Sequence, residues 1–334
     1  MRKALFLFSF IISFLFSTFS VEAVGSESVC LIDGDTNTVL YQKNMDVQNL
    51  TASIAKIATA IVAIENVDVF ASVTITEGDM AEGSSVYLKP GDTVLFIDLL
   101  YGLMLRSGND CAMAIANNTF GKYDLFIKEM NLLCRKLGLN NTTFENPSGL
   151  DETTKNYSTA YDMSILMSYC MGNEIFREVT KAREYTADIN GPVTWYQKHK
   201  LINTNEYVIG GKTGYTTKAG RTLISVYEKD GKQLICVTFK IADDYNLHLQ
   251  LFEEYIDKVT MKLVLEAQVL KQELELDFYP LVKDDIYLPI ASDSIVTIKF
   301  VFYDIVDDVC GEILVYQNDT LLYEDILYVY RLEF

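Results

Sequence analysis

A serine and a lysine three residues apart are the first feature of this chain that could do chemistry. Ser53 and Lys56 lie in a stretch, residues 51–65, that is small or apolar at almost every position after the lysine. Residues three apart share one face of a helix, so the hydroxyl lies beside the amine. A lysine in a buried helix must be paired or lose its proton. The pair therefore indicates an activated serine nucleophile, with a capping serine and a snorkelling lysine as the structural alternative.

Two further short motifs follow in the chain, Ser107-Gly108-Asn109 and Lys212-Thr213-Gly214. An asparagine can both donate and accept hydrogen bonds, and a glycine lets another backbone approach a strand edge closely. Alone, the first motif is equally typical of an inter-helix turn and the second of a strand end. A phosphate loop is excluded because Glu206 stands where that motif needs a glycine. Three motifs in this order are a much stronger signal than any one of them.

Other catalytic chemistries lack the residues they need. The chain has two histidines, His199 and His248, and neither belongs to an H-E-x-x-H pattern. No G-x-S-x-G sequence is present, so a lysine is a better candidate than a histidine for the base that activates a serine. The sequence therefore predicts no metal site and no cofactor.

Composition and the N-terminus indicate an exported globular protein. The net charge of −18 over 334 residues argues against a nucleic-acid partner. Arg2 and Lys3 precede an apolar run over residues 4–19, and small residues suited to a signal peptidase follow in Val21-Glu22-Ala23. Residues 1–23 are expected to be a cleaved secretory signal, with an uncleaved signal anchor as the alternative. We therefore expect an extracytoplasmic protein.

Six cysteines occur without a C-x-x-C pattern, mostly among apolar neighbours, and are predicted to be buried free thiols. A disulfide is an open alternative outside the cytoplasm.

Hydrophobic periodicity and turn residues predict helices and strands in two regions. Helices are expected at residues 51–65, 96–106, 111–118, 125–137, 159–171 and 244–270. Strands are expected at 29–33, 38–41, 73–75, 86–88, 208–215, 222–228 and 233–240, then at 295–300, 313–316 and 321–323. Turns are expected at Asp230-Gly231 and Asn318-Asp319. The predicted domains are a catalytic domain over residues 24–262 and a small β-domain over 263–334.

The three motifs are accompanied by several longer matches, and together they resemble the low-molecular-mass penicillin-binding serine D-alanyl-D-alanine carboxypeptidases. The resemblance covers nearly the whole mature chain. Its further segments are Gly83-Ser84-Ser85, and residues 88–92, 98–103, 146–150, 157–160, 203–205, 211–216 and 219–220. The resemblance implies an α+β fold of the β-lactamase/DD-peptidase type: an antiparallel sheet flanked by helices, a helical subdomain and a small C-terminal all-β domain.

The resemblance also implies a role for each motif residue. Ser53 would attack the carbonyl between two terminal D-alanines of a peptidoglycan stem peptide, and Lys56 would take its proton. Ser107 would relay a proton to the leaving amine, and Asn109 would orient the lysine. β-Lactam antibiotics would acylate the same serine.

For the substrate, the resemblance assigns residues of the third motif. Lys212 and Thr213 would meet the terminal carboxylate, Gly214 would allow the peptide to approach, and the backbone N–H groups of Ser53 and Tyr215 would form the oxyanion hole.

Some positions depart from the family pattern. Thr51 and Ala55 stand where the family usually has Pro and Thr around the nucleophile, and Asn156 replaces a common histidine. Residues 328–334 are strand-like and lack a basic face, so no clear C-terminal membrane anchor is predicted. Two alternative functions remain: a β-lactamase of the same fold, and a catalytically inactive peptidoglycan-binding protein.

Overall fold

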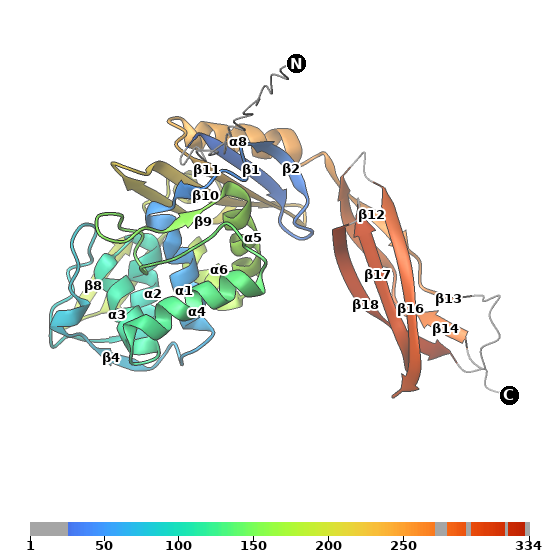
Figure 1. Cartoon of the computed structure of the whole chain (residues 1–334), viewed down its shortest axis with the longest axis horizontal. Helices are drawn as coiled ribbons and strands as arrows, with labels where there is room; N and C mark the ends of the chain where they lie inside the picture. Colours follow the sequence, from blue (N-terminus) through green and yellow to red (C-terminus); the bar gives the residue numbers. More distant parts are fainter. Residues whose placement is uncertain (1–25, 271–278, 292–294, 318–319, 331–334) are drawn as a thin grey trace, which may run out of the picture.

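The computed structural model describes residues 26–270, 279–291, 295–317 and 320–330. The predicted signal segment and the predicted turn at 318–319 lie outside the described residues. Figure 1 shows a mixed helix-and-sheet region followed by a region built of strands alone. No helix in the described ranges is long and apolar enough to cross a membrane.

A five-stranded antiparallel sheet forms the centre of the first region. Its strands, in spatial order, are β2 (Val39–Lys43), β1 (Ser28–Asp33), β11 (Lys232–Phe239), β10 (Gly220–Lys229) and β9 (Val208–Thr216). The predicted turn joins β10 to β11, and Asp230 and Gly231 both have positive φ, as the tightest hairpin turns require. β9 is left at an edge of the sheet, where its outer side is open to another chain.

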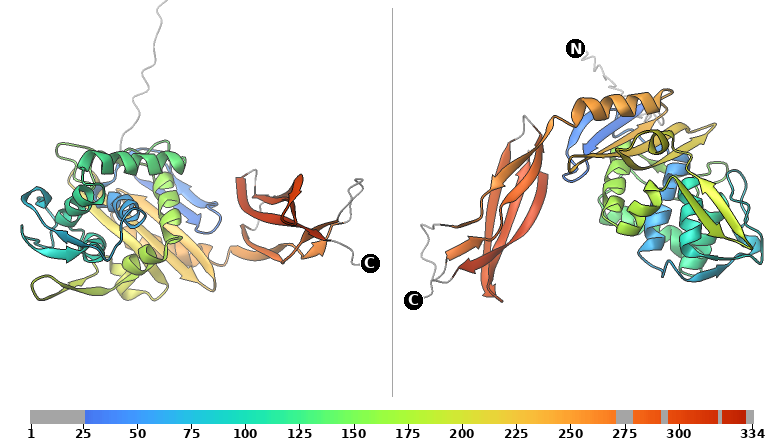
Figure 2. Two further views of the ribbon diagram at one scale, coloured as in Figure 1. Left: turned by 90° about the horizontal axis from the view of Figure 1, so that it is seen from below. Right: turned by 180° about the vertical axis from the view of Figure 1, so that it is seen from behind.

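Helices cover both faces of this sheet (Figures 1 and 2). Along β1, Val29 and Leu31 pack against helix α8 (Asp244–Tyr255), while Cys30 and Ile32 point into the larger core on the other face. This alternation follows from the two-residue period of a strand. The sheet is therefore buried on both sides.

The larger core surrounds helix α1 (Lys56–Ile64), all of whose residues are buried. Its neighbours are α2 (Phe96–Leu105), α3 (Asn109–Thr119), α4 (Tyr123–Lys136), α5 (Ala160–Met171) and α6 (Glu174–Lys181). A helix that is apolar all round is stable only inside such a cluster. Short elements complete the region: the 3₁₀ helix η2 (Glu77–Asp79), helix α7 (Lys200–Thr204), and the strand pairs β3 (Asn49–Leu50) with β6 (Tyr157–Ser158) and β7 (Glu184–Asp188) with β8 (Pro192–Tyr196).

The predicted helix over residues 51–65 begins differently in the structure. Residues Ala52–Ala55 form a 3₁₀ turn, η1, and the α-helix starts at Lys56. Ala52 has φ of +47°, a left-handed conformation that an α-helix cannot include. The nucleophile candidate therefore lies on a tight turn and not on the regular helix.

The predicted strand over residues 86–88 is wrong. The segment is irregular, and strand β4 (Ser72–Thr74) pairs with β5 (Thr93–Leu95) instead. The N–H groups of Val86 and Leu88 both donate to the carboxylate of Asp110. A side chain thus takes the donors that a strand ladder would need.

The predicted helix over residues 244–270 is also wrong in its second half. Helix α8 ends at Tyr255, and strand β12 (Val259–Leu265) follows and pairs with β15 (Ile286–Ala291). Pairing with a distant strand decides the conformation of this apolar stretch, and local periodicity does not reveal it.

The C-terminal region is built entirely of strands. β13 (Gln268–Val269), β14 (Tyr279–Val282), β18 (Thr320–Tyr330), β17 (Val309–Gln317) and β16 (Val296–Val306) form a second five-stranded sheet in that order. Side chains from β15, such as Ile290, pack with Ile313 and Val315 of β17 in a separate core.

These two regions confirm the predicted α+β fold class with a C-terminal all-β part. The domain boundary proposed at residue 262 falls inside β12, and that division remains a prediction. All six cysteines are buried and unpaired, as predicted.

Candidate active site

Ser53 and Lys56 form a direct pair at the start of α1. The Lys56 Nζ lies 3.0 Å from the Ser53 Oγ, 2.7 Å from the Asn109 Oδ1 and 2.6 Å from the Ser148 carbonyl oxygen. Lys56 has no exposed surface, and burial lowers its pKa to about 7. A neutral amine can donate its two hydrogens to the two carbonyl-type oxygens and keep its lone pair for the serine hydroxyl. This geometry suits a lysine that accepts the Ser53 proton.

The turn that carries Ser53 is fixed from both sides. The Thr51 N–H donates to the Asn156 carbonyl at 3.0 Å, and the Thr222 hydroxyl donates to the Thr51 carbonyl at 3.0 Å. Gly149 packs so closely that a Cβ there would overlap the carbonyl oxygen of Ala52. The positive φ at Ala52 is therefore held in place by surrounding structure, as strained residues at functional sites require.

A second serine–lysine pair lies beside the first. The Lys212 Nζ is 3.0 Å from the Ser107 Oγ and 2.9 Å from the Thr213 carbonyl oxygen. Burial, helped by the charges of Lys56 and Lys198, holds the pKa of Lys212 well below its usual range. An anion entering the site would reverse this effect, because an opposite charge favours the protonated amine.

Asn109 connects the lysine to one wall of the site. It is the first residue of α3, and its side-chain N–H₂ donates to the Glu82 carbonyl at 2.6 Å while its oxygen accepts from Lys56. Its backbone N–H donates to the Ser84 carbonyl at 2.7 Å. One residue therefore orients the amine and anchors the neighbouring loop.

Strand β9 brings the third motif against the nucleophile. A Cβ placed on Gly214 would lie 2.8 Å from the Ser53 backbone nitrogen and would overlap the Thr222 hydroxyl. Only glycine permits this approach, and the predicted close approach of a substrate peptide at Gly214 remains a prediction. The next residue, Tyr215, is 68% exposed at the mouth of the site.

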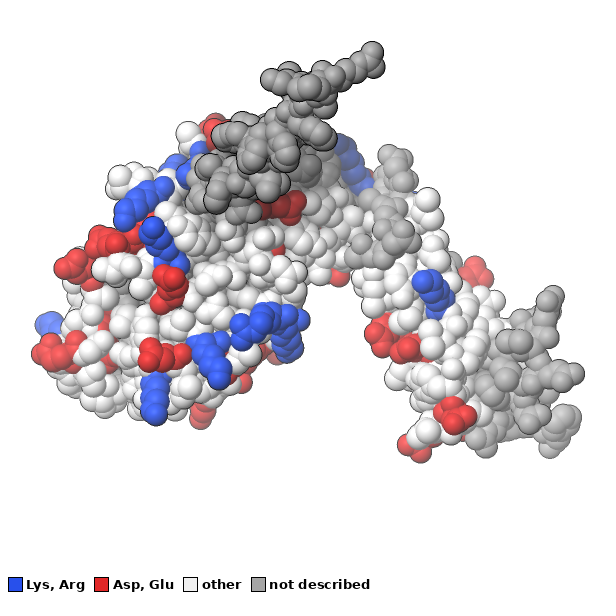
Figure 3. Space-filling view, in the orientation of Figure 1, with Lys and Arg blue, Asp and Glu red and all other residues white. Residues whose placement is uncertain are grey.

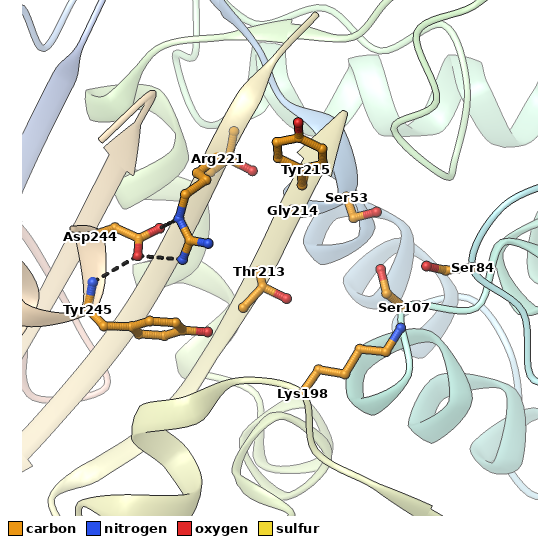
Figure 4. A pocket seen from close by; sticks show the side chains of 11 residues that line it. Ser53, Ser84, Ser107, Lys198, Thr213, Gly214, Tyr215, Arg221, Asp244 and Tyr245 are labelled. Carbon is orange, nitrogen blue, oxygen red and sulfur yellow. Dashed lines mark hydrogen bonds and ion pairs between the residues drawn. The ribbon is translucent and has the colours of Figure 1, made fainter. Parts of the chain in front are cut away.

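An open pocket of about 410 Å³ runs between β9 and the two serines. Figure 4 shows Arg221, Asp244 and Tyr245 at one end, Ser84 at the opposite end, and Ser53 and Ser107 between them. The wall residues are Ser53, Ser84, Ser107, Lys198, Thr213, Gly214, Tyr215, Arg221, Thr222, Asp244 and Tyr245.

The structure brings the predicted site residues together. Five of them line the pocket: Ser53, Ser107, Thr213, Gly214 and Tyr215. Of the other three, Lys56 and Lys212 are hydrogen-bonded to Ser53 and Ser107, and Asn109 accepts a hydrogen bond from Lys56. Their individual roles remain predictions.

Six pocket residues are not among the eight predicted site residues, namely Ser84, Lys198, Arg221, Thr222, Asp244 and Tyr245. Asp244 accepts from Arg221 at 3.0 and 2.6 Å, and the guanidinium lies 5.6 Å from the Tyr245 ring. Only Ser84 stood in a segment noted for its resemblance. The others come from the start of β10, the start of α8 and the link between β8 and α7, where no local spacing signals a shared site.

Comparison with known proteins finds relatives of the first, mixed helix-and-sheet region of the chain. The family model described as D-alanyl-D-alanine carboxypeptidase matches residues 16–242. The D-alanyl-D-alanine carboxypeptidase DacF of Bacillus subtilis is 34% identical over 227 residues, which are 64% of this chain and 57% of that protein. The chain thus spans less than two thirds of this relative's length.

Solved structures give the same result. A D-alanyl-D-alanine carboxypeptidase from Mycobacterium tuberculosis H37Rv superposes with a TM-score of 0.66 at 28% identity, covering 69% of this chain and 90% of that one. The DacD structure from Francisella tularensis reaches a TM-score of 0.69 over 91% of this chain and 92% of its own, and at 21% identity it shows a shared fold only. With its three motifs assembled in one pocket and its family match over residues 16–242, the chain belongs to the D-alanyl-D-alanine carboxypeptidase family of serine peptidases.

Proposed function

We propose that this chain is an extracytoplasmic serine carboxypeptidase that removes the terminal D-alanine from peptidoglycan stem peptides ending in D-Ala-D-Ala. One observation carries the proposal: two buried lysines, Lys56 and Lys212, each contact a different serine of the same open pocket. Two such pairs supply a nucleophile with its base and a second hydroxyl that relays protons. The predicted signal over residues 1–23 supports action outside the cytoplasm.

Acylation begins with transfer of the Ser53 proton to Lys56. The Ser53 oxygen attacks the carbonyl between the two D-alanines and forms a tetrahedral intermediate. The N–H groups of Ser53 and Tyr215 would stabilise its oxyanion, an effect that close packing of Gly214 against the Ser53 nitrogen supports. The C–N bond then breaks as Ser107 relays the proton held by Lys56 to the leaving amine, which leaves Lys56 neutral, Ser107 unchanged and the acyl group on Ser53.

Hydrolysis completes the cycle. Water attacks the acyl-enzyme ester, a proton moves to Lys56, and the Ser53 oxygen regains a proton as the shortened peptide leaves. The enzyme returns to its starting state, and the net reaction consumes one water and releases one D-alanine.

Cationic side chains of the pocket are suited to the free carboxylate of the last D-alanine. Lys212 lies beside Thr213, and Lys198 and Arg221 line the same cavity. Positive charge in this pocket contrasts with the net charge of −18 of the whole chain. The substrate would therefore lie with its carboxyl terminus toward Arg221 and its peptide chain toward Ser84 (Figure 4).

Mass spectrometry of a muropeptide pentapeptide incubated with the protein tests this proposal. The expected product has lost one alanine residue, and Ser53→Ala should yield none. Ser72→Ala, a change at an exposed serine of β4, is the matched control and should leave the product unchanged. An unaltered pentapeptide with the native protein would contradict the proposal and favour an inactive peptidoglycan-binding protein.

Release of bound penicillin distinguishes a carboxypeptidase from a β-lactamase of the same fold. Fast release needs a carboxylate placed to activate water. Among the described residues, the pocket holds a single carboxylate, Asp244, which is paired with Arg221; Glu145 is exposed and accepts from the Lys155 N–H. We therefore expect a long-lived adduct, and repeated turnover of penicillin within seconds would identify a β-lactamase.

A further inference from the structure

An exposed tyrosine with a left-handed backbone lies in the loop that forms one wall of the pocket. Tyr87 has φ of +65°, and 83% of its surface is exposed. A bulky residue with positive φ is uncommon and persists only where its surroundings impose it. Its neighbour Leu88 is buried, so the chain turns inward immediately after exposing the phenol.

One buried carboxylate imposes this conformation. Asp110 is 2% exposed and accepts from the Ser85 hydroxyl at 2.5 Å, the Val86 N–H at 3.0 Å and the Leu88 N–H at 3.2 Å. The Tyr87 N–H donates a hydrogen bond to the Ser85 hydroxyl oxygen at 2.8 Å. Asp110 thus binds the backbone N–H groups on both sides of Tyr87, and it holds the backbone in the conformation that leaves the tyrosine exposed.

The same loop is attached to the catalytic residues. Asp110 directly follows Asn109, whose N–H and side chain hold the carbonyls of Ser84 and Glu82. Ser84 lines the pocket, and three residues of extended chain span at most about 10 Å. Ser84 lies at the end of the pocket opposite Arg221 (Figure 4), so the exposed Tyr87 belongs to a segment within about 10 Å of that end.

We propose that Tyr87 is a specificity-determining residue that contacts the stem peptide on the amino-terminal side of the scissile bond, and that Asp110 is the positioning residue that holds it there. This inference rests on the proposed carboxypeptidase function, which places the peptide chain at the Ser84 end. The exposed ring offers an apolar face and a hydroxyl to an extended peptide. Substrates that end after the reacting residues would not reach it.

Steady-state kinetics on two substrates test the inference. The first is an N-acetylated D-Ala-D-Ala dipeptide, and the second is a stem pentapeptide with the same carboxyl terminus. Tyr87→Ala should lower kcat/KM for the pentapeptide by about five- to tenfold, the usual effect of one aromatic contact, and leave the dipeptide unchanged. Phe70→Ala removes an aromatic residue that is 68% exposed elsewhere, and should change neither value.

Two further variants separate contact from folding. Tyr87→Gly removes the backbone strain along with the ring, so it should raise the melting temperature while losing the same preference for the pentapeptide. Asp110→Asn should also lose this preference, and with it some thermal stability, because the loop loses a charged acceptor.

The outcomes distinguish this inference from the proposed function. If the native protein hydrolyses both substrates and the ratio of the two kcat/KM values is the same in Tyr87→Ala, the inference is wrong and the proposed function stands. A loss restricted to a pentapeptide that carries its disaccharide would also overturn the peptide contact. If the native protein hydrolyses neither substrate, the proposed function itself fails.

Discussion

At the scale of single residues, the site depends on a lysine that is kept from solvent. Lys56 has no exposed surface, and its three polar neighbours are the hydroxyl of Ser53 and the oxygens of Asn109 and Ser148. No carboxylate is among these partners, so burial dominates and the pKa falls to about 7. The S-x-x-K spacing predicted the pair, but the Ser148 contact depends on a loop ninety-two residues away.

The first prediction concerns pH. Only neutral Lys56 can accept the Ser53 proton, and the fraction that is neutral falls as pH drops below its pKa of about 7. The rate constant for acylation by penicillin should therefore rise about tenfold per pH unit from pH 5 to near 7, then level off. Stopped-flow measurement between pH 5 and 9, with circular dichroism to confirm folding at each pH, checks this. A rate that falls as pH rises through 7 would contradict it.

A second prediction concerns carboxylate capture by Lys212. Lys212→Ala should lower kcat/KM for a peptide with a free terminal carboxylate by about 10- to 100-fold, the usual effect of losing a charge-assisted hydrogen bond. An analogue with an amidated terminus should lose much less. Lys200→Ala, at an exposed lysine of α7, is the control. Equal losses for the two peptides in Lys212→Ala would exclude the carboxylate role.

At the scale of elements, the site is held by contacts between segments that are distant in sequence. The apolar pattern after Lys56 predicted a buried helix, and the glycines and hydrophobic runs predicted β9, β10 and β11. The 3₁₀ turn at Ala52 was not predictable, because it is imposed by Gly149 and by the Thr222 hydroxyl. The same reasoning explains residues 86–88 and the second half of the predicted helix 244–270, where distant partners decide the backbone.

The third prediction tests the fit between this turn and its neighbour. Gly149 has φ of +85°, and a Cβ there would overlap the Ala52 carbonyl. Gly149→Ala should displace the Ser53 turn and lower the acylation rate by at least about tenfold, since misplacement of about 1 Å can cost a hundredfold.

A matched variant separates this clash from the backbone cost. Gly138 has φ of +72°, and no atom lies within 4 Å of the position that a Cβ would take there. Gly138→Ala should therefore cost about 1 kcal/mol of stability and leave acylation unchanged. Similar acylation rates in the two variants would show that close packing against Ala52 has no catalytic consequence.

At the scale of the whole molecule, the catalytic region and the C-terminal strands have separate cores. Two of the three hydrophobic clusters contain only residues up to Ile256, and the third contains only residues from Val264 onward. Gln317 of β17 donates to the Thr38 hydroxyl at 3.0 Å, which is a polar contact between the regions. Figure 3 shows acidic and basic side chains interspersed on the visible face of the catalytic region.

The fourth prediction follows from these separate cores. A protein that ends at residue 258 keeps every residue of the pocket and both of its supporting clusters. It should fold and be acylated by penicillin at a rate within about threefold of the full chain, because neither cluster loses a member. A melting curve establishes folding. A folded but unreactive fragment would show that the C-terminal strands contribute to the site.

Acylation of Ser53 is the central claim, and peptide mapping by mass spectrometry after reaction with penicillin tests it most directly. The predicted result is one added penicilloyl group on the peptide that contains Ser53, and no added mass in Ser53→Ala, which should retain the native melting temperature because the exchange removes only a hydroxyl. An adduct on another residue, or one that survives in Ser53→Ala, would contradict the claim.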